Sequence, residues 1–102
     1  MDKIKVITTE RGADYGKPID HFNTTRKMFD IWEAKREKGE ELPEELENVV
    51  KHISYLVIDK LARLAQNPLK LDNYLDIQGY ISLFEKSVDD YNIRHDDDIK
   101  FN

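Results

Sequence analysis

Apolar residues recur at intervals of three and four along most of the chain, which places them on one side of an α-helix. The first series is short and contains Phe22, Phe29 and Trp32. The second is the longest and consists of Leu46, Val49, Val50, Ile53, Leu56, Val57, Leu61 and Leu64. The third consists of Tyr74, Ile77, Ile81, Phe84, Val88 and Tyr91. No reliable pair of strands accompanies these series, so the sequence predicts an all-α fold.

Proline and glycine residues define the ends of the predicted helices. These helices run from Ile19 to Lys38, from Pro43 to Gln66 and from Asp72 to Asn92. Pro18 precedes the first helix, and Gly39 is expected to end it as the residue after the C-cap. Pro68 disfavours helical backbone at Asn67, which ends the second helix. Asp72 is expected to cap the third helix. The short connection makes the second and third helices an antiparallel hairpin.

A chain of 102 residues predicts a single domain. Residues 1–18 are interpreted as an arm and loop, residues 19–92 as the three main helices, and residues 93–102 as an acidic tail that ends in solvent. Residues 3–9, "KIKVITT", are β-branched and fit either a strand or an irregular arm. The third helix carries more apolar residues than one hairpin covers, so a homo-oligomer built on a dimer is expected.

The composition excludes several classes of protein. The chain has no cysteine, which excludes disulfides and thiolate metal sites. It has no apolar run long enough to span a membrane and no signal peptide, so we expect a cytoplasmic protein. The net charge of −5 argues against coating nucleic acid. Five aspartates fall within residues 89–102, which leaves the rest of the chain close to neutral and able to bind an anion.

Two polar stripes meet in the predicted hairpin. One contains His52, Tyr55, Asp59 and Arg63, and the other contains Asp72, Asp76, Gly79 and Tyr80. Folding the hairpin about its loop places Arg63 near Asp76 and Asp59 near Gly79. Glycine costs about 1 kcal/mol relative to alanine inside a helix, which suggests close approach of a backbone or a ligand at Gly79.

Two interpretations of these stripes remain open. In the first, ion pairs Arg63–Asp76 and Lys60–Asp72 orient the hairpin. In the second, the stripes form a pocket in which carboxylates hold a divalent cation, basic residues bind phosphate and tyrosines stack on a base. The candidate ligand-binding residues are Tyr15, Lys17, Tyr55, Lys60, Arg63, Asp76 and Tyr80, and the candidate metal ligands are Asp59, Asp72 and Asp76. Tyr15 and Lys17 are included because they precede a helix N-terminus, which favours anions.

Three segments carry a family resemblance: "DYGKPIDHF", "DKLARLAQNP" and "DNYLDIQGY". Their order and spacing resemble a family of small helical proteins from phages and prophages, which is similar in turn to the MazG-type all-α nucleotide pyrophosphohydrolases. Those enzymes hold magnesium with an E-x-x-E motif on one helix and an E-x-x-D motif on the next. The resemblance places Asp76 in the second motif with Asn73 in place of an acid. In the first motif it leaves Asp59 as the only carboxylate, with Ala62 at another ligand position.

The resemblance implies two functions of different classes. One is capture of a nucleotide-derived ligand without turnover, with no required cofactor, such as sequestration of a nucleotide signal of host defence in the host cytoplasm. The other is a magnesium-dependent nucleotide pyrophosphohydrolase, in which Asp59, Asp72 and Asp76 hold the ion. The incomplete metal motif favours capture. A structural interaction module without a ligand is the third alternative.

Overall fold

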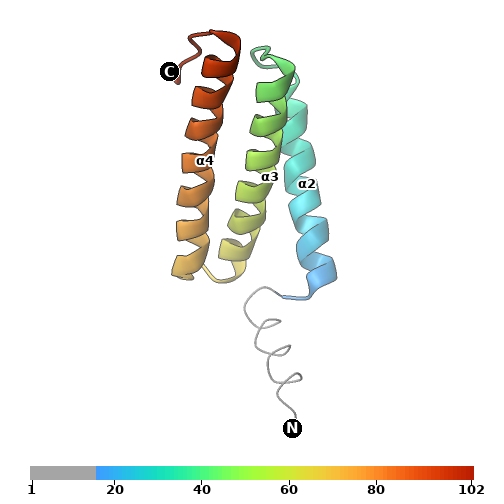
Figure 1. The fold of residues 1–102 in the computed structure, drawn as a ribbon. Helices are drawn as coiled ribbons and strands as arrows, with labels where there is room; N and C mark the ends of the chain where they lie inside the picture. Colours follow the sequence, from blue (N-terminus) through green and yellow to red (C-terminus); the bar gives the residue numbers. More distant parts are fainter. Residues whose placement is uncertain (1–15) are drawn as a thin grey trace.

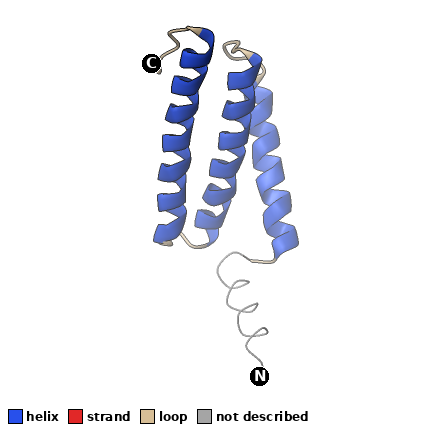
Figure 2. Ribbon diagram, in the orientation of Figure 1, coloured by secondary structure: helices blue, strands red, loops and turns tan. Residues whose placement is uncertain are grey.

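The computed structural model describes residues 16–102, and all regular structure in this part of the chain is helical (Figure 2). The helices are α2 (Pro18–Arg36), α3 (Glu44–Gln66) and α4 (Leu71–His95). The predicted all-α fold is therefore confirmed for these residues. The predicted arm and the alternatives for residues 3–9 lie outside the described residues. None of the three helices combines the length and the apolar character that a membrane span requires.

The three helices form an open layer rather than a closed bundle. α3 lies between α2 and α4 and runs antiparallel to both (Figure 1). No Cα atom of α2 lies within 8 Å of a Cα atom of α4. The predicted hairpin of α3 and α4 is confirmed, and its loop is closed by a hydrogen bond from the Lys70 N–H to the Asn67 carbonyl at 3.2 Å. Both faces of the layer remain uncovered by another helix of the described chain.

The hydrophobic core is small for this reason. Among the described residues, the buried apolar side chains are Phe29, Leu46, Ile58, Ala62, Leu64 and Val88. Other members of the predicted apolar series remain half exposed, such as Leu61 at 46% and Ile81 at 47%. A short chain buries a limited share of its surface, and large exposed apolar patches are typical of interfaces.

The inward stripe of α2 differs from the predicted one. His21, Thr25 and Phe29, which follow each other in steps of four, are all buried. The buried line drifts around the helix by about 40° with each step of four and reaches His21 at the start of α2, so Phe22, which points about 100° away from His21, is 60% exposed. Trp32 stacks on Phe29 with ring centroids 5.5 Å apart. The prediction was therefore right for Phe29 and wrong for Phe22 as a core residue.

Two helix ends differ from the sequence prediction. α2 ends at Arg36, and Gly39 does not adopt a positive φ; its N–H instead donates to the Arg36 carbonyl at 3.0 Å in a tight turn. The N-cap of α4 is Lys70 rather than Asp72. Asp72 lies in the first turn, where its negative charge still favours the positive end of the helix dipole.

The C-terminal segment also corrects a prediction. α4 continues to His95, and Asp96 then adopts a left-handed backbone conformation with φ 50° that reverses the chain. Residues 96–102, which we call the strap, turn back beside the end of α4 (Figure 1). The Phe101 ring lies 5.3 Å from the Phe84 ring. The tail that was predicted to be solvated is thus partly packed, because its apolar residues Ile99 and Phe101 lie against apolar residues of α3 and α4.

Candidate functional site

Two polar networks near the loop of the hairpin link α2 to α3 and α3 to α4. Together we call them the hairpin-end cluster, and its members are His21, Asp59, Lys60, Arg63 and Asp76. His21 Nε2 lies 2.7 Å from Asp59 Oδ1, and Arg63 Nε donates to Asp59 Oδ2 at 3.1 Å. A carboxylate only accepts hydrogen bonds, so Nε2 is the protonated nitrogen of His21. Asp59 thereby links α2 to α3.

Burial and hydrogen bonding act on the ionisation of Asp59 in opposite directions. Burial raises the pKa of Asp59, whereas the hydrogen bonds from His21 and Arg63 and the charges of these two residues lower it. The net effect holds the pKa of Asp59 below its ordinary value of 3.8. The carboxylate is therefore ionised at neutral pH and serves as a fixed acceptor.

The ion pairs of the hairpin differ from the predicted pairs. Lys60 Nζ lies 2.9 Å from Asp76 Oδ2, in place of the predicted Lys60–Asp72 pair, and Arg63 pairs with Asp59 on its own helix in place of the predicted Arg63–Asp76 pair. Adjacent residues on a helix point about 100° apart. Lys60 consequently faces α4, whereas Asp59 faces α2.

The three candidate metal ligands do not come together in residues 16–102. Asp59 is committed to His21 and Arg63, Asp76 is committed to Lys60, and Asp72 is exposed in the first turn of α4. The described residues contain no group of three or more histidine or carboxylate side chains that could hold a metal ion. The predicted shared ion among these three aspartates is therefore not supported by their arrangement.

No other group of the described residues packs closely against Gly79, in contrast to the close approach predicted from the sequence. A Cβ atom built on Gly79 meets no heavy atom within 4 Å. Gly79 is exposed, and its α3 counterpart Asp59 points toward α2 instead. The glycine is therefore not required by packing within this part of the chain.

Gly79→Ala is expected to raise the free energy of unfolding by about 1 kcal/mol, because alanine has the higher helix propensity and the new methyl group enters open space. Urea unfolding of the variant measures the change. Gly39→Ala is the matched control and should bring no such gain, since its Cβ would lie 2.8 Å from Arg36 Nη1. A loss of stability in Gly79→Ala would restore the close-approach interpretation.

The remaining candidate ligand-binding residues have different environments. Tyr15 lies outside the described residues, and Lys17 is exposed at the N-cap of α2. Tyr55 packs edge-to-face on Phe29 at 5.4 Å, so its ring joins α2 to α3 rather than facing the hairpin. Tyr80 is half-buried on α4. The structure thus brings Lys60 and Asp76 together and places Tyr55 on the other side of α3.

Two helix N-termini lie at the same end of the layer as the hairpin-end cluster (Figure 1). Neither α2 nor α4 has a hydrogen bond from the side chain of its N-cap residue, and both N-caps are lysines, Lys17 and Lys70. Asn73, in the first turn of α4, is 2% exposed, and its Nδ2 has no hydrogen-bond partner within the described chain. The N–H groups at helix N-termini, the positive ends of helix dipoles and lysines all favour an anion.

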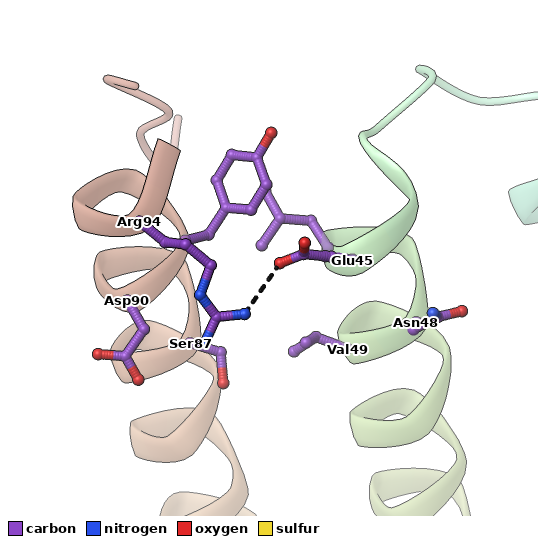
Figure 3. Close-up of a pocket in the computed structure, with 8 residues that line it drawn as sticks. Glu45, Asn48, Val49, Ser87, Asp90 and Arg94 are labelled. Carbon is purple, nitrogen blue, oxygen red and sulfur yellow. Dashed lines mark hydrogen bonds and ion pairs between the residues drawn. The ribbon is translucent and has the colours of Figure 1, made fainter. Parts of the chain in front are cut away.

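A cavity lies at the opposite end of the α3–α4 pair (Figure 3). It measures about 340 Å³ and is lined by residues that include Glu45, Asn48, Ser87, Asp90 and Arg94. Arg94 Nη1 donates to Glu45 Oε2 at 3.3 Å, and the Ser87 hydroxyl donates to the Leu83 carbonyl at 2.8 Å. The lining carries two carboxylates against one guanidinium, so it suits a phosphate less well than the hairpin end does.

His21 is the member of the hairpin-end cluster that the sequence analysis missed. The available signal was its position four residues before Thr25 and eight before Phe29, which puts it on the inward stripe of α2. Without a partner at a metal-ligand spacing, His21 carried no sign of its bond to Asp59, which lies 38 residues further along the chain. The stripe alone would have predicted a buried histidine in need of an acceptor.

Comparison with known proteins adds a family. No curated protein and no solved structure matches the chain. Residues 2–88 match the family described as "Domain of unknown function (DUF6378)". This match covers most of the chain and carries no statement of phage origin or of a relation to the MazG-type enzymes. The chain belongs to the DUF6378 family.

Proposed function

We propose that the chain binds a nucleotide-derived anionic ligand at its hairpin end and does not turn it over. The observation that carries the proposal is that the N-termini of α2 and α4, neither capped by the side chain of its N-cap residue, lie at the same end of the layer as Lys17, Lys70 and Arg63. Phosphate oxygens would accept hydrogen bonds from such groups. Asn73 Nδ2 offers a further buried donor.

The arrangement of carboxylates favours capture over hydrolysis. A magnesium-dependent pyrophosphohydrolase needs several oxygen ligands around its ion, usually two or more carboxylates in these enzymes. Asp59 and Asp76 are each engaged by basic side chains, and Asp72 stands apart from them. The proposed function therefore requires no magnesium.

The biological setting of the proposal rests on the resemblance described above. A MazG-like relationship and a phage-type origin would make the ligand a nucleotide signal of host defence, sequestered in the host cytoplasm. The exposed apolar residues favour a second candidate function, an interaction module. A homo-oligomer is part of both functions.

The decisive experiment incubates the purified protein with a nucleotide panel, with and without Mg²⁺, and then heats it and identifies what is released. Capture predicts that an intact nucleotide is recovered in both conditions. Magnesium-dependent accumulation of monophosphate and pyrophosphate would overturn capture in favour of hydrolysis. If no nucleotide is retained, the interaction module becomes the better interpretation.

Arg63→Ala is expected to weaken binding of the retained nucleotide ten- to a hundredfold, because a charge-assisted contact with phosphate contributes about 1.5–3 kcal/mol. Isothermal titration measures the dissociation constant. Arg94→Ala is the matched control, since Arg94 is also paired with a carboxylate but lies at the far end of α4. Equal weakening by both variants would contradict a site at the hairpin end.

A further inference from the structure

An apolar groove runs between α3 and α4 at the end opposite the hairpin loop. Its helical walls are Leu46 and Val50 from α3 and Phe84 and Val88 from α4. The cavity that remains in it measures about 190 Å³ and is also lined by residues 99–102 of the strap. The strap therefore covers apolar surface that the helices would otherwise expose.

Few contacts hold the strap in place. The Asp97 N–H donates to the Asn92 carbonyl at 3.0 Å, where α4 ends. The Asn92 side chain donates to the Ile99 carbonyl at 2.8 Å and accepts from the Ile99 N–H at 3.0 Å. Phe101 contacts the Phe84 ring and remains 59% exposed. A segment held by one side chain and two apolar residues can be displaced by a competitor for the same groove.

The apolar face continues beyond the strap toward the hairpin loop. Steps of three and four from Val50 lead along α3 to Val57 and Leu61, and the same steps from Phe84 lead along α4 to Ile81 and Tyr74. Leu61 is 46% exposed, Ile81 is 47% exposed and Tyr74 is 45% exposed. Within residues 16–102, the face thus has a part covered by the strap and a part beside it that the strap does not cover.

We propose that this α3–α4 face pairs with the same face of a second copy of the chain, and that the strap competes with that copy for the covered part. The proposal deepens the homo-oligomer put forward above and is independent of the nucleotide ligand. A face that is apolar in one copy is apolar in the other, which is the requirement for an isologous dimer.

The size of the face supports a role for the strap. A helix of 23 residues is about 35 Å long, and two helices packed roughly 10 Å apart present a strip about 20 Å wide, so the whole face offers about 700 Å² per copy. Stable interfaces bury about 800 Å² per partner. The uncovered half alone falls well short of this area, so a seated strap weakens pairing.

The charge of the strap acts in the same direction. Asp96, Asp97 and Asp98 precede its apolar residues, and Lys100 is the one basic residue within it. Two copies that pair with their straps seated bring these like charges near each other, which costs free energy at low ionic strength. Displacing the strap removes both the steric cover and this repulsion from the interface.

Sedimentation equilibrium of the double variant Ile99→Ala/Phe101→Ala tests the proposal, because this variant releases the groove and keeps every charge. Its dimer dissociation constant is expected to be at least about tenfold lower than that of the unchanged chain, roughly 1.4 kcal/mol tighter. Asn92→Ala removes the two hydrogen bonds between the Asn92 side chain and Ile99 and should act in the same direction. Ile93→Ala is the control, since Ile93 is 82% exposed outside the strap, and it should match the unchanged chain.

The opposite results separate the two parts of the proposal. Equal dissociation constants for the unchanged chain and both strap variants would overturn competition by the strap and leave the dimer in place. Monomers in every case at high micromolar concentration would overturn pairing itself. Leu61→Asp, on the uncovered part of the face, should abolish association in all backgrounds, and a dimer that survives this change would place the interface elsewhere.

Discussion

Replacing Asp59 by alanine is expected to lower the free energy of unfolding by about 3 kcal/mol, the low end of the range for breaking a buried ion pair. The side chain of His21 is 5% exposed and that of Asp59 is 20% exposed. The variant leaves the buried Nε2–H of His21 without its acceptor and removes one partner of Arg63. Because Asp59 links α2 to α3, its removal weakens the packing of the whole of α2 on α3.

Asp76→Ala is the matched control for this change. Asp76 also forms an ion pair with a residue of α3, Lys60, but the side chain of Asp76 is 48% exposed. Removing this pair should therefore lower the free energy of unfolding by less than about 1 kcal/mol. Urea unfolding of both variants gives the comparison, and His21→Ala with the double variant completes a double-mutant cycle for the His21–Asp59 contact. An equal decrease in the free energy of unfolding for Asp59→Ala and Asp76→Ala would contradict the inference that Asp59 is the more important residue for joining the helices.

The pH dependence of unfolding provides a second measurement on the same side chain. The folded pKa of Asp59 lies below its ordinary value of 3.8, so the unfolded chain binds the proton more readily. The stabilisation is therefore fully present above pH 3.8 and is lost as the pH falls through the folded pKa. The difference in stability between the unchanged chain and Asp59→Ala should shrink in that acidic range, and a difference that grows on acidification would show that the sign is wrong.

The helices could be predicted from the sequence because their signals are local. The apolar series and the prolines located α3 almost to the residue, and Pro68 ended it at Gln66 as expected. The tertiary arrangement was not available from such signals. A closed bundle and an open layer require the same periodicity in each helix, and what separates them here is that α2 and α4 never meet.

The candidate site was predictable only in part, for a geometric reason. Residues at equal distance from a hairpin loop do face each other approximately, and the Lys60–Asp76 pair follows that rule. The rule gives the height along the helix and not the direction of the side chain. Asp59 lies at the same height along the hairpin as Gly79, but its side chain points to α2. There it accepts a hydrogen bond from His21, which lies 38 residues earlier in the chain. The spacing of residues within one helix does not predict a contact between residues so far apart in the sequence.

The small core makes Leu46 the position at which a conservative truncation should be most costly. Leu46 is 3% exposed and lines both the cavity of about 340 Å³ and the groove cavity of about 190 Å³. Leu46→Ala would leave a void between the two cavities, and leucine truncation in a core costs about 2–5 kcal/mol. Against a total stability of roughly 5–15 kcal/mol, that loss leaves the domain close to unfolding.

Leu83→Ala supplies the comparison, because Leu83 lies in α4 but is 55% exposed, and its truncation should cost less than about 1 kcal/mol. Thermal and urea unfolding at low protein concentration measure both variants without a contribution from self-association. If Leu46→Ala lost no more than Leu83→Ala, the α3–α4 contact would not depend on the interior side chains that separate its two cavities. The stability of the hairpin would then have to come from surface polar pairs such as Lys60–Asp76, whose individual contributions are too small to supply it.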